Sequence, residues 1–179
     1  AAMAGSGEEA ENSLAYLRAL AHHQEQAGAT FLDINVDEFS LKSSEQKSAM
    51  QWLVGAVQKM SDLPLSIDSS DVEVIQVGLE ACQNTGARPM LNSASLERLE
   101  ALGLAVVHNA QVVVTAAGER GMPSNTEERV ANASRMVDAA LNKGIARDDI
   151  HIDPLVFPIS VDKDFGLHCL DAIRDLRAK

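Results

Sequence analysis

The stretch PLSIDSSDVEVIQVGLEAC, residues 64–82, joins a short apolar strand to a helix through a polar turn. The apolar residues of the strand alternate with Ser66 and Asp68, so the strand ends on a carboxylate. The residues that follow the turn repeat apolar side chains at helical spacing. A strand that ends in polar residues and leads into a helix is typical of parallel α/β proteins. This stretch therefore predicts a chain built from strand–helix units.

The same unit recurs on both sides of this stretch. Hydrophobic periodicity predicts helices at residues 8–27, 43–60, 72–82, 96–109 with a break near Gly103, 124–142 and 163–179. Strands are predicted at residues 30–35, 64–68, 89–92, 112–116 and 150–153, and Gly86 is expected to end the third helix. Ser43 with Gln46, and Ser124 with Glu127, have the spacing of capping boxes. Because no linker or charge block divides the series, we expect one domain over residues 1–179.

Five alternating strands fit either an open flavodoxin-like sheet or part of a TIM barrel. Polar residues lie at nearly every carboxyl end of a predicted strand: Asp33, Asn35, Asp68, Asn92, Thr115 and Asp153. Barrels build their active sites from all of these ends, whereas open sheets bind ligands mainly at one switch point. We therefore expect a (β/α)8 TIM barrel with five of its eight strands present. His151 shares a face with Asp153, which predicts a hydrogen-bonded histidine in the barrel interior.

The composition narrows the possible partners. A formal charge of -11 and a pI of about 4.8 oppose nucleic-acid binding, which depends on lysines and arginines that neutralise phosphates. No apolar run approaches the roughly 20 residues of a membrane-spanning helix, and the N-terminal residues do not resemble a signal peptide. A cytoplasmic location without membrane contact is therefore expected. Cys82 and Cys169 have no C-x-x-C partner, so we expect packed, reduced thiols and no metal site.

Five segments resemble, in order and spacing, successive motifs of the pterin-binding methyltetrahydrofolate methyltransferases. They are GATFLDINVDEFS, PLSIDSSDVEVIQVGLEAC, RPMLNSASLERLEAL, VVVTAAGERGMPSNTEERV and DIHIDPLVFPISVD, and they run from Gly28 to Asp162. That family includes corrinoid protein methyltransferases and the folate domain of cobalamin-dependent methionine synthase. The resemblance implies a dihydropteroate synthase-like barrel that moves a methyl group between N5 of tetrahydrofolate and the cobalt of a corrinoid (cobalamin) protein. It also implies pairing as a homodimer.

The resemblance assigns roles to particular residues. Asp68, Asn92 and Asp153 match the family's pterin-contacting positions, and Asp33 with Asn35 matches its LDxN strand. The chemistry agrees, because a pterin carries an exocyclic amine and a ring N–H as adjacent donors that one carboxylate can accept together. Each residue alone also has a structural interpretation: Asp33 as a loop anchor, Asp68 as a helix cap, Asn92 as a turn residue.

The family also predicts a catalytic group. Its members place an asparagine near N5 in a Gly-x-Ser-Asn stretch, and no such stretch occurs before Lys179. We therefore expect the catalytic asparagine beyond Lys179, and we expect these 179 residues alone to retain the folate-site geometry without methyl transfer. Two alternatives stay open. A dihydropteroate synthase is disfavoured because LDINVDEFS stands in place of a GGESTRP-like loop, and a noncatalytic pterin-binding module is the other.

Overall fold

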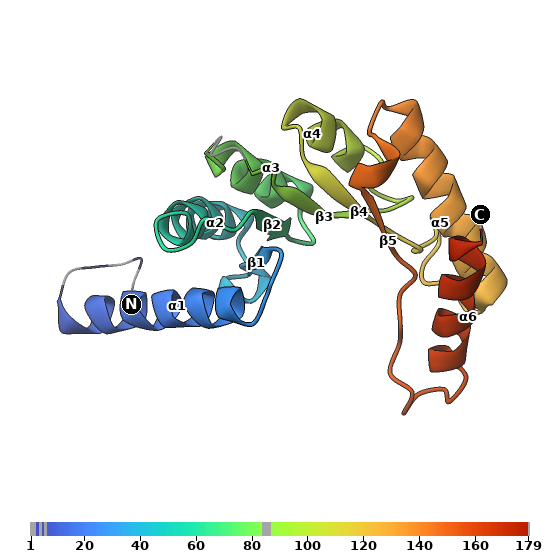
Figure 1. The fold of residues 1–179 in the computed structure, drawn as a ribbon, viewed down its shortest axis with the longest axis horizontal. Coiled ribbons are helices and arrows are strands. Elements are labelled where there is room, and N and C mark those ends of the chain that lie inside the picture. Colours follow the sequence, from blue (N-terminus) through green and yellow to red (C-terminus); the bar gives the residue numbers. More distant parts are fainter. Residues whose placement is uncertain (1–2, 4, 6, 84–86, 179) are drawn as a thin grey trace. The chain divides into compact units, whose positions relative to one another are not determined.

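The computed structural model describes residues 3, 5, 7–83 and 87–178, so the expected helix end at Gly86 lies outside the described residues. Helices alternate with five strands, which follow the order β1-β2-β3-β4-β5 in a parallel sheet (Figure 1). The predicted α/β class is therefore confirmed. The residues group into two compact units, 1–92 and 93–179, which are described in turn. The prediction of a single domain stays a prediction.

The first unit contains three helices and the strands β1 to β3. Its elements are α1 (Glu8–Gln26), β1 (Leu32–Asn35), the 3-10 turn η1 (Asp37–Phe39), α2 (Ser43–Val57), β2 (Leu65–Asp68), α3 (Val72–Ala81) and the start of β3 (Met90–Ala94). Helix α2 packs on β1 and α3 packs on β2, and the two helices lie side by side (Figure 1). Ile67 and Leu91 are fully buried beneath them. One face of these strands therefore forms the hydrophobic core with the helices.

Gly78 permits the close contact between α3 and β2. A Cβ atom at this position would lie 2.5 Å from Cγ2 of Ile67 and 3.0 Å from Cγ of Met50. Both neighbours are fully buried, so neither has room to move away. A glycine is therefore required for the helix to lie this close to the strand that ends at Asp68.

The second unit continues the alternation with α4 (Ala101–Val107), β4 (Gln111–Thr115), α5 (Thr126–Asn142), the 3-10 turn η2 (Arg147–Asp149), β5 (Ile150–Asp153) and α6 (Phe165–Arg177). Helix α5 packs on β4, β5 and α6. Its inner face is made of small and flexible side chains, and Ala133, Met136 and Ala140 are fully buried. The apolar residues Val112 and Val114 of β4 are fully buried as well.

The helix boundaries differ from the predicted ones in several places. Helix α2 ends at Val57 rather than at residue 60, and α6 begins at Phe165 rather than at residue 163. Helix α4 begins only at Ala101 and runs through Gly103 without a break. Residues 96–100 form consecutive turns instead, because Arg98 N–H and Ala101 N–H each donate to the carbonyl three residues earlier. The apolar pattern alone does not distinguish such turns from a helix.

Both predicted capping boxes are wrong. Ser43 donates its hydroxyl to Asp71 at 2.6 Å, and the side-chain amide of Gln46 donates to the carbonyls of Asp37 and Ser40, so neither caps α2. Helix α5 is capped one residue later than predicted. Asn125 Oδ1 accepts the N–H of Glu128 at 2.8 Å, as an N-cap residue does.

Candidate functional site

A row of polar side chains runs from the carboxyl ends of β1 and β2 to the middle of β3. The strand register places Asn35 opposite Asp68, and Asp68 opposite Asn92. Successive residues of a strand point to opposite faces, and β1 accordingly buries Leu32 and Ile34 while Asp33 and Asn35 are exposed. The row therefore lies on the face of the strands opposite to the helices of the core.

A side-chain hydrogen bond links two members of this row. Asn35 Nδ2 donates to Asp68 Oδ2 at 3.0 Å. A second hydrogen bond fixes the orientation of the Asn35 side-chain amide, because its Oδ1 accepts the backbone N–H of Asp37 at 2.9 Å. The amide therefore presents its donor to the carboxylate, and the two strand ends hold each other in place.

Asp37 ties together the turns that follow β1 and β2. Its carboxylate accepts the hydroxyl of Ser69 at 2.6 Å and the backbone N–H of Ser70 at 2.8 Å. The turn directly after Asp68 is thereby fixed to the turn directly after Asn35. Sequence reasoning missed this residue, although it lies within the quoted LDINVDEFS motif.

Asp68 does not cap the following helix. The N-cap of α3 is Asp71, whose Oδ1 accepts the N–H of Glu73 at 2.8 Å. The hydroxyl of Ser43 donates to the same carboxylate, and this hydrogen bond is the largest of the effects that lower the pKa of Asp71. The structural interpretation of Asp68 as a cap is therefore wrong, and its carboxylate lies on the polar face.

Asp33 lies one step further from the strand end, opposite Ser66 in the register. Together with Asn35 it lines an open cavity of about 130 Å³, whose other lining residues are mostly apolar side chains of α1, β1 and α2, among them Leu17, Leu20 and Leu53. Asp33 is thus between this cavity and the polar row. Within the described part of the chain, no cluster of three or more His, Cys, Asp or Glu side chains is arranged to hold a metal ion.

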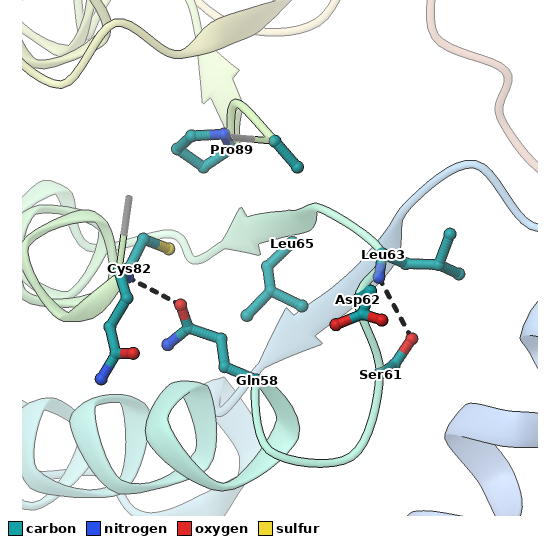
Figure 2. A pocket seen from close by; sticks show the side chains of 9 residues that line it. Gln58, Ser61, Asp62, Leu63, Leu65, Cys82 and Pro89 are labelled. Carbon is teal, nitrogen blue, oxygen red and sulfur yellow. Dashed lines mark hydrogen bonds between the residues drawn. The ribbon is translucent and has the colours of Figure 1, made fainter. Parts of the chain in front are cut away.

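A second cavity lies at the opposite, amino ends of β2 and β3 (Figure 2). Its volume of about 30 Å³ is enough for about one water molecule. Gln58 spans one side, where its Oε1 accepts the N–H of Gln83 at 2.7 Å. Burial raises the pKa of the Cys82 thiol here to about 11, so this thiol stays protonated at neutral pH. Size and chemistry make this cavity a poor binding site.

In the second unit, Asp153 ends β5 and lies opposite Thr115 of β4 in the register. Its Oδ1 accepts the backbone N–H of Leu155 at 2.8 Å, and its carbonyl accepts the N–H of Ala116 at 2.9 Å. His151 on the same strand makes the predicted hydrogen bond, between its Nε2 and Gln111 Oε1 at 2.7 Å, and its ring is exposed. Asp153 is therefore exposed and held by the turn that follows it.

Arg129 is the largest of the fully buried side chains, and sequence reasoning missed it. Its Nε donates to the carbonyl of Leu155 at 3.1 Å, and its Nη1 donates to the carbonyl of Asn125 at 2.9 Å. The guanidinium carbon lies 5.4 Å from the centre of the Phe157 ring. The sequence around it, NTEERV, looks like an exposed first helical turn and gives no signal of burial.

The sequence of the chain matches a known protein family. The family described as pterin binding enzyme matches residues 6–179. The chain belongs to the pterin-binding enzyme family. Two relatives show how it is related to better-known members. The chain is 30% identical over 173 residues to a methionine synthase of Mycobacterium leprae, which covers 89% of this chain and 14% of that protein. It is 28% identical over 176 residues to a methylcorrinoid:tetrahydrofolate methyltransferase of Eubacterium limosum, with 93% and 61% covered.

Solved structures of other proteins share the fold. A dihydropteroate synthase of Xanthomonas albilineans in complex with 7,8-dihydropteroate superposes with a TM-score of 0.71 at 20% identity, over 98% of this chain and 63% of that one. The Yersinia pestis enzyme with a pterine-sulfa conjugate gives 0.69 at 21%, over 92% and 64%. The predicted dihydropteroate synthase-like barrel fold is confirmed. The chain spans less than two thirds of the length of each of these relatives.

The predicted family is confirmed as well, whereas the assignment of single residues to the pterin stays a prediction. None of the helices in the described part of the chain is long and apolar enough to cross a membrane. Cys82 and Cys169 are free cysteines.

Proposed function

We propose that the protein binds a tetrahydrofolate by its pterin ring and transfers a methyl group between N5 of the folate and the cobalt of a corrinoid protein. The observation that carries the proposal is the polar row Asn35, Asp68 and Asn92, with its hydrogen bond from Asn35 to Asp68. Similarity to a methylcorrinoid:tetrahydrofolate methyltransferase supports the choice of substrate and partner.

The row suits the edge of a pterin ring. An ionised carboxylate has about four lone-pair sites, so Asp68 can accept the hydrogen bond of Asn35 and also paired donors of a ligand. Paired hydrogen bonds to a carboxylate are strong and fix the plane of the ring. Asn92 adds an amide that both donates and accepts. The family resemblance assigns a pterin contact to Asp153 as well, and Asp33 lies one step further from the end of β1 than Asn35 does.

The contribution of this chain to catalysis is orientation. N5 of methyltetrahydrofolate is a poor leaving group, and breaking its bond to the methyl group requires protonation or a hydrogen bond at N5. A ring held at several points keeps N5 and its methyl group in one direction, which removes much of the entropic part of the barrier. The corrinoid, carried by the partner protein, supplies the cobalt that gives or accepts the methyl group.

Two measurements on the purified protein test the proposal. In the first, titration with 5-methyltetrahydrofolate should show saturable binding, and its absence would refute the proposed site. In the second, a protein that includes the expected catalytic asparagine is mixed with 5-methyltetrahydrofolate and a Co(I) corrinoid protein, and the visible spectrum should change to that of the methylated cobalt, whereas residues 1–179 alone should bind the folate without this change. Binding without this change by the protein that includes the asparagine would identify a noncatalytic pterin-binding protein. In a separate assay with 4-aminobenzoic acid and a dihydropterin pyrophosphate, formation of dihydropteroate with release of pyrophosphate would instead identify a dihydropteroate synthase.

A further inference from the structure

We propose that Arg129 is a positioning residue for Asp153, through the peptide of Leu155. The inference rests on the proposed function, in which Asp153 contacts the pterin. Arg129 itself touches no ligand in this proposal. Its effect on binding passes through one backbone turn.

A continuous chain of hydrogen bonds joins the two side chains. Arg129 Nε donates to the carbonyl of Leu155 at 3.1 Å, and the N–H of the same residue donates to Asp153 Oδ1 at 2.8 Å. Both backbone polar groups of Leu155, its N–H and its carbonyl, are therefore hydrogen-bonded. Because Oδ1 is tied to this peptide, the rotation of the Asp153 carboxylate follows the position of the turn.

The turn needs support from outside. Leu155 has a φ of 62°, in the left-handed region that side chains other than glycine rarely adopt. Pro154, directly before it, has no N–H and so cannot donate a backbone hydrogen bond to the turn. An unfavourable backbone conformation persists only where neighbouring groups hold it, and such positions are common at functional sites. The hydrogen bond from Arg129 to the carbonyl of Leu155 holds the turn in this conformation.

The surroundings of Arg129 fix the guanidinium itself. Its Nη1 donates to the carbonyl of Asn125 at 2.9 Å, and its guanidinium carbon lies over the ring of Phe157. Phe157 in turn packs edge-on against Phe165 of α6, with ring centres 5.3 Å apart. Contacts from the start of α5 and from the segment after β5 thereby fix the orientation of the guanidinium group.

Stability alone does not explain an arginine at this position. The side chain is fully buried, and its Nη2 has no hydrogen-bond partner among the described residues. Burying a charge is unfavourable unless its hydrogen bonds are satisfied, and apolar side chains of similar size commonly stabilise a core as well or better. A role in orienting the turn accounts for the residue and for its two donated hydrogen bonds.

The test uses Arg129→Lys, which keeps the charge but loses the planar pair of donors. Its matched control is Arg135→Lys on the same helix, where the side chain is half-exposed and pairs with Glu119. Two quantities are measured: amide hydrogen exchange of Leu155 without ligand, and affinity for 5-methyltetrahydrofolate with Asp153 intact or replaced by alanine. Because folding of Arg129→Lys is itself at risk, Phe157→Leu serves as a milder variant that loosens the same guanidinium.

We expect Arg129→Lys to accelerate exchange at Leu155 and to lower the affinity about tenfold, with less than about twofold further loss once Asp153 is alanine. Phe157→Leu should act in the same way, with a loss of about threefold. Arg135→Lys should change neither quantity. An equal loss in both Asp153 backgrounds, or unchanged exchange at Leu155, would overturn the inference. Absence of binding by the unmodified protein would instead refute the proposed function.

Discussion

Asp68 and Asp153 both end a parallel strand with a carboxylate, yet the molecule holds them in different ways. Asp68 is bound by a side chain of the neighbouring strand, Asn35 Nδ2, at 3.0 Å. Asp153 is bound by a backbone N–H two residues further along its own chain, that of Leu155, at 2.8 Å. The first carboxylate is supported by the sheet, and the second by a turn.

The groups that hold the turns after Asp68 and Asp153 also differ. The turn after Asp68 is tied to the turn after the first strand by two hydrogen bonds to the carboxylate of Asp37. The turn after Asp153 depends on one buried cation, Arg129, and on a residue with positive φ. Support that is spread over a sheet tolerates single substitutions better than support through one buried side chain. The comparison therefore predicts where function is robust and where it is fragile.

The largest effect is expected from Asp68→Asn. The amide keeps the shape and the acceptor for Asn35 but can no longer accept two donors of a pterin through a charged group. We expect the affinity for 5-methyltetrahydrofolate to fall about 50-fold, measured by calorimetric titration. The control Asp62→Asn, in the loop before the same strand, should bind as the unmodified protein does. Equal affinities for the two variants would remove Asp68 from the site.

Gly78→Ala tests the packing behind β2. The added Cβ would meet Ile67 at 2.5 Å and Met50 at 3.0 Å, so the helix must shift from the strand that carries Asp68. We expect a loss of about 2 kcal/mol in the free energy of unfolding, measured with urea. Gly55→Ala is the control on α2, because nothing lies within 4 Å of its Cβ, and it should be neutral or slightly stabilising. Equal stability of the two variants would show that α3 is not held tightly on β2.

Asn35→Ala removes the support of Asp68 while leaving the carboxylate in place. One hydrogen bond to a charged group is lost at the polar row, and we expect an affinity for 5-methyltetrahydrofolate about fivefold lower. The exposed Asn12 on α1 provides the control, Asn12→Ala. A loss as large as the loss of about tenfold expected for Arg129→Lys would mean that the sheet support is no more robust than the turn, contrary to the comparison.

The smallest effect concerns the helix caps of the two units. The pKa of Asp71 is lowered in the folded protein, chiefly by the hydroxyl of Ser43, so its charge stabilises the fold above the ordinary aspartate pKa of 3.8 and this contribution is lost as pH falls through the lowered value. Asp71→Asn should therefore cost about 0.5 kcal/mol at pH 7 and less at pH 3, measured with urea. The corresponding cap Asn125 is uncharged, and Asn125→Ser should have the same effect at both pH values. A cost for Asp71→Asn that does not change with pH would contradict this assignment.

The sequence predicts the strand ends well. Alternation of apolar and polar residues over so short a strand as LSID determines which face each side chain takes, so Asp68 and its neighbours could be placed on the polar face. The family followed from the order and spacing of the motifs, and the match over residues 6–179 confirms it. The hydrogen bond between Asn35 and Asp68 could not be predicted, because it depends on the exact register of two strands.

The supports of the site were not predictable for a physical reason. Arg129 lies among polar residues, and its burial arises only when the turn after β5 folds over the start of α5. The capping residues failed similarly, since Ser43 and Gln46 have the right spacing but donate to groups outside the helix: Ser43 to Asp71, and Gln46 to the carbonyls of Asp37 and Ser40. Local patterns describe the strands and helices; tertiary contacts decide which polar side chains serve the turns between them.

The central claim is that strand-end carboxylates hold the pterin, and a crystal structure of the protein with 5-methyltetrahydrofolate tests it most directly. We predict that the amine and ring N–H of the pterin lie within hydrogen-bond distance of the carboxylate of Asp68 or Asp153, with Asn92 at the ring edge. A pterin seated instead in the cavity between α1 and β1, or elsewhere on the surface, would contradict the account.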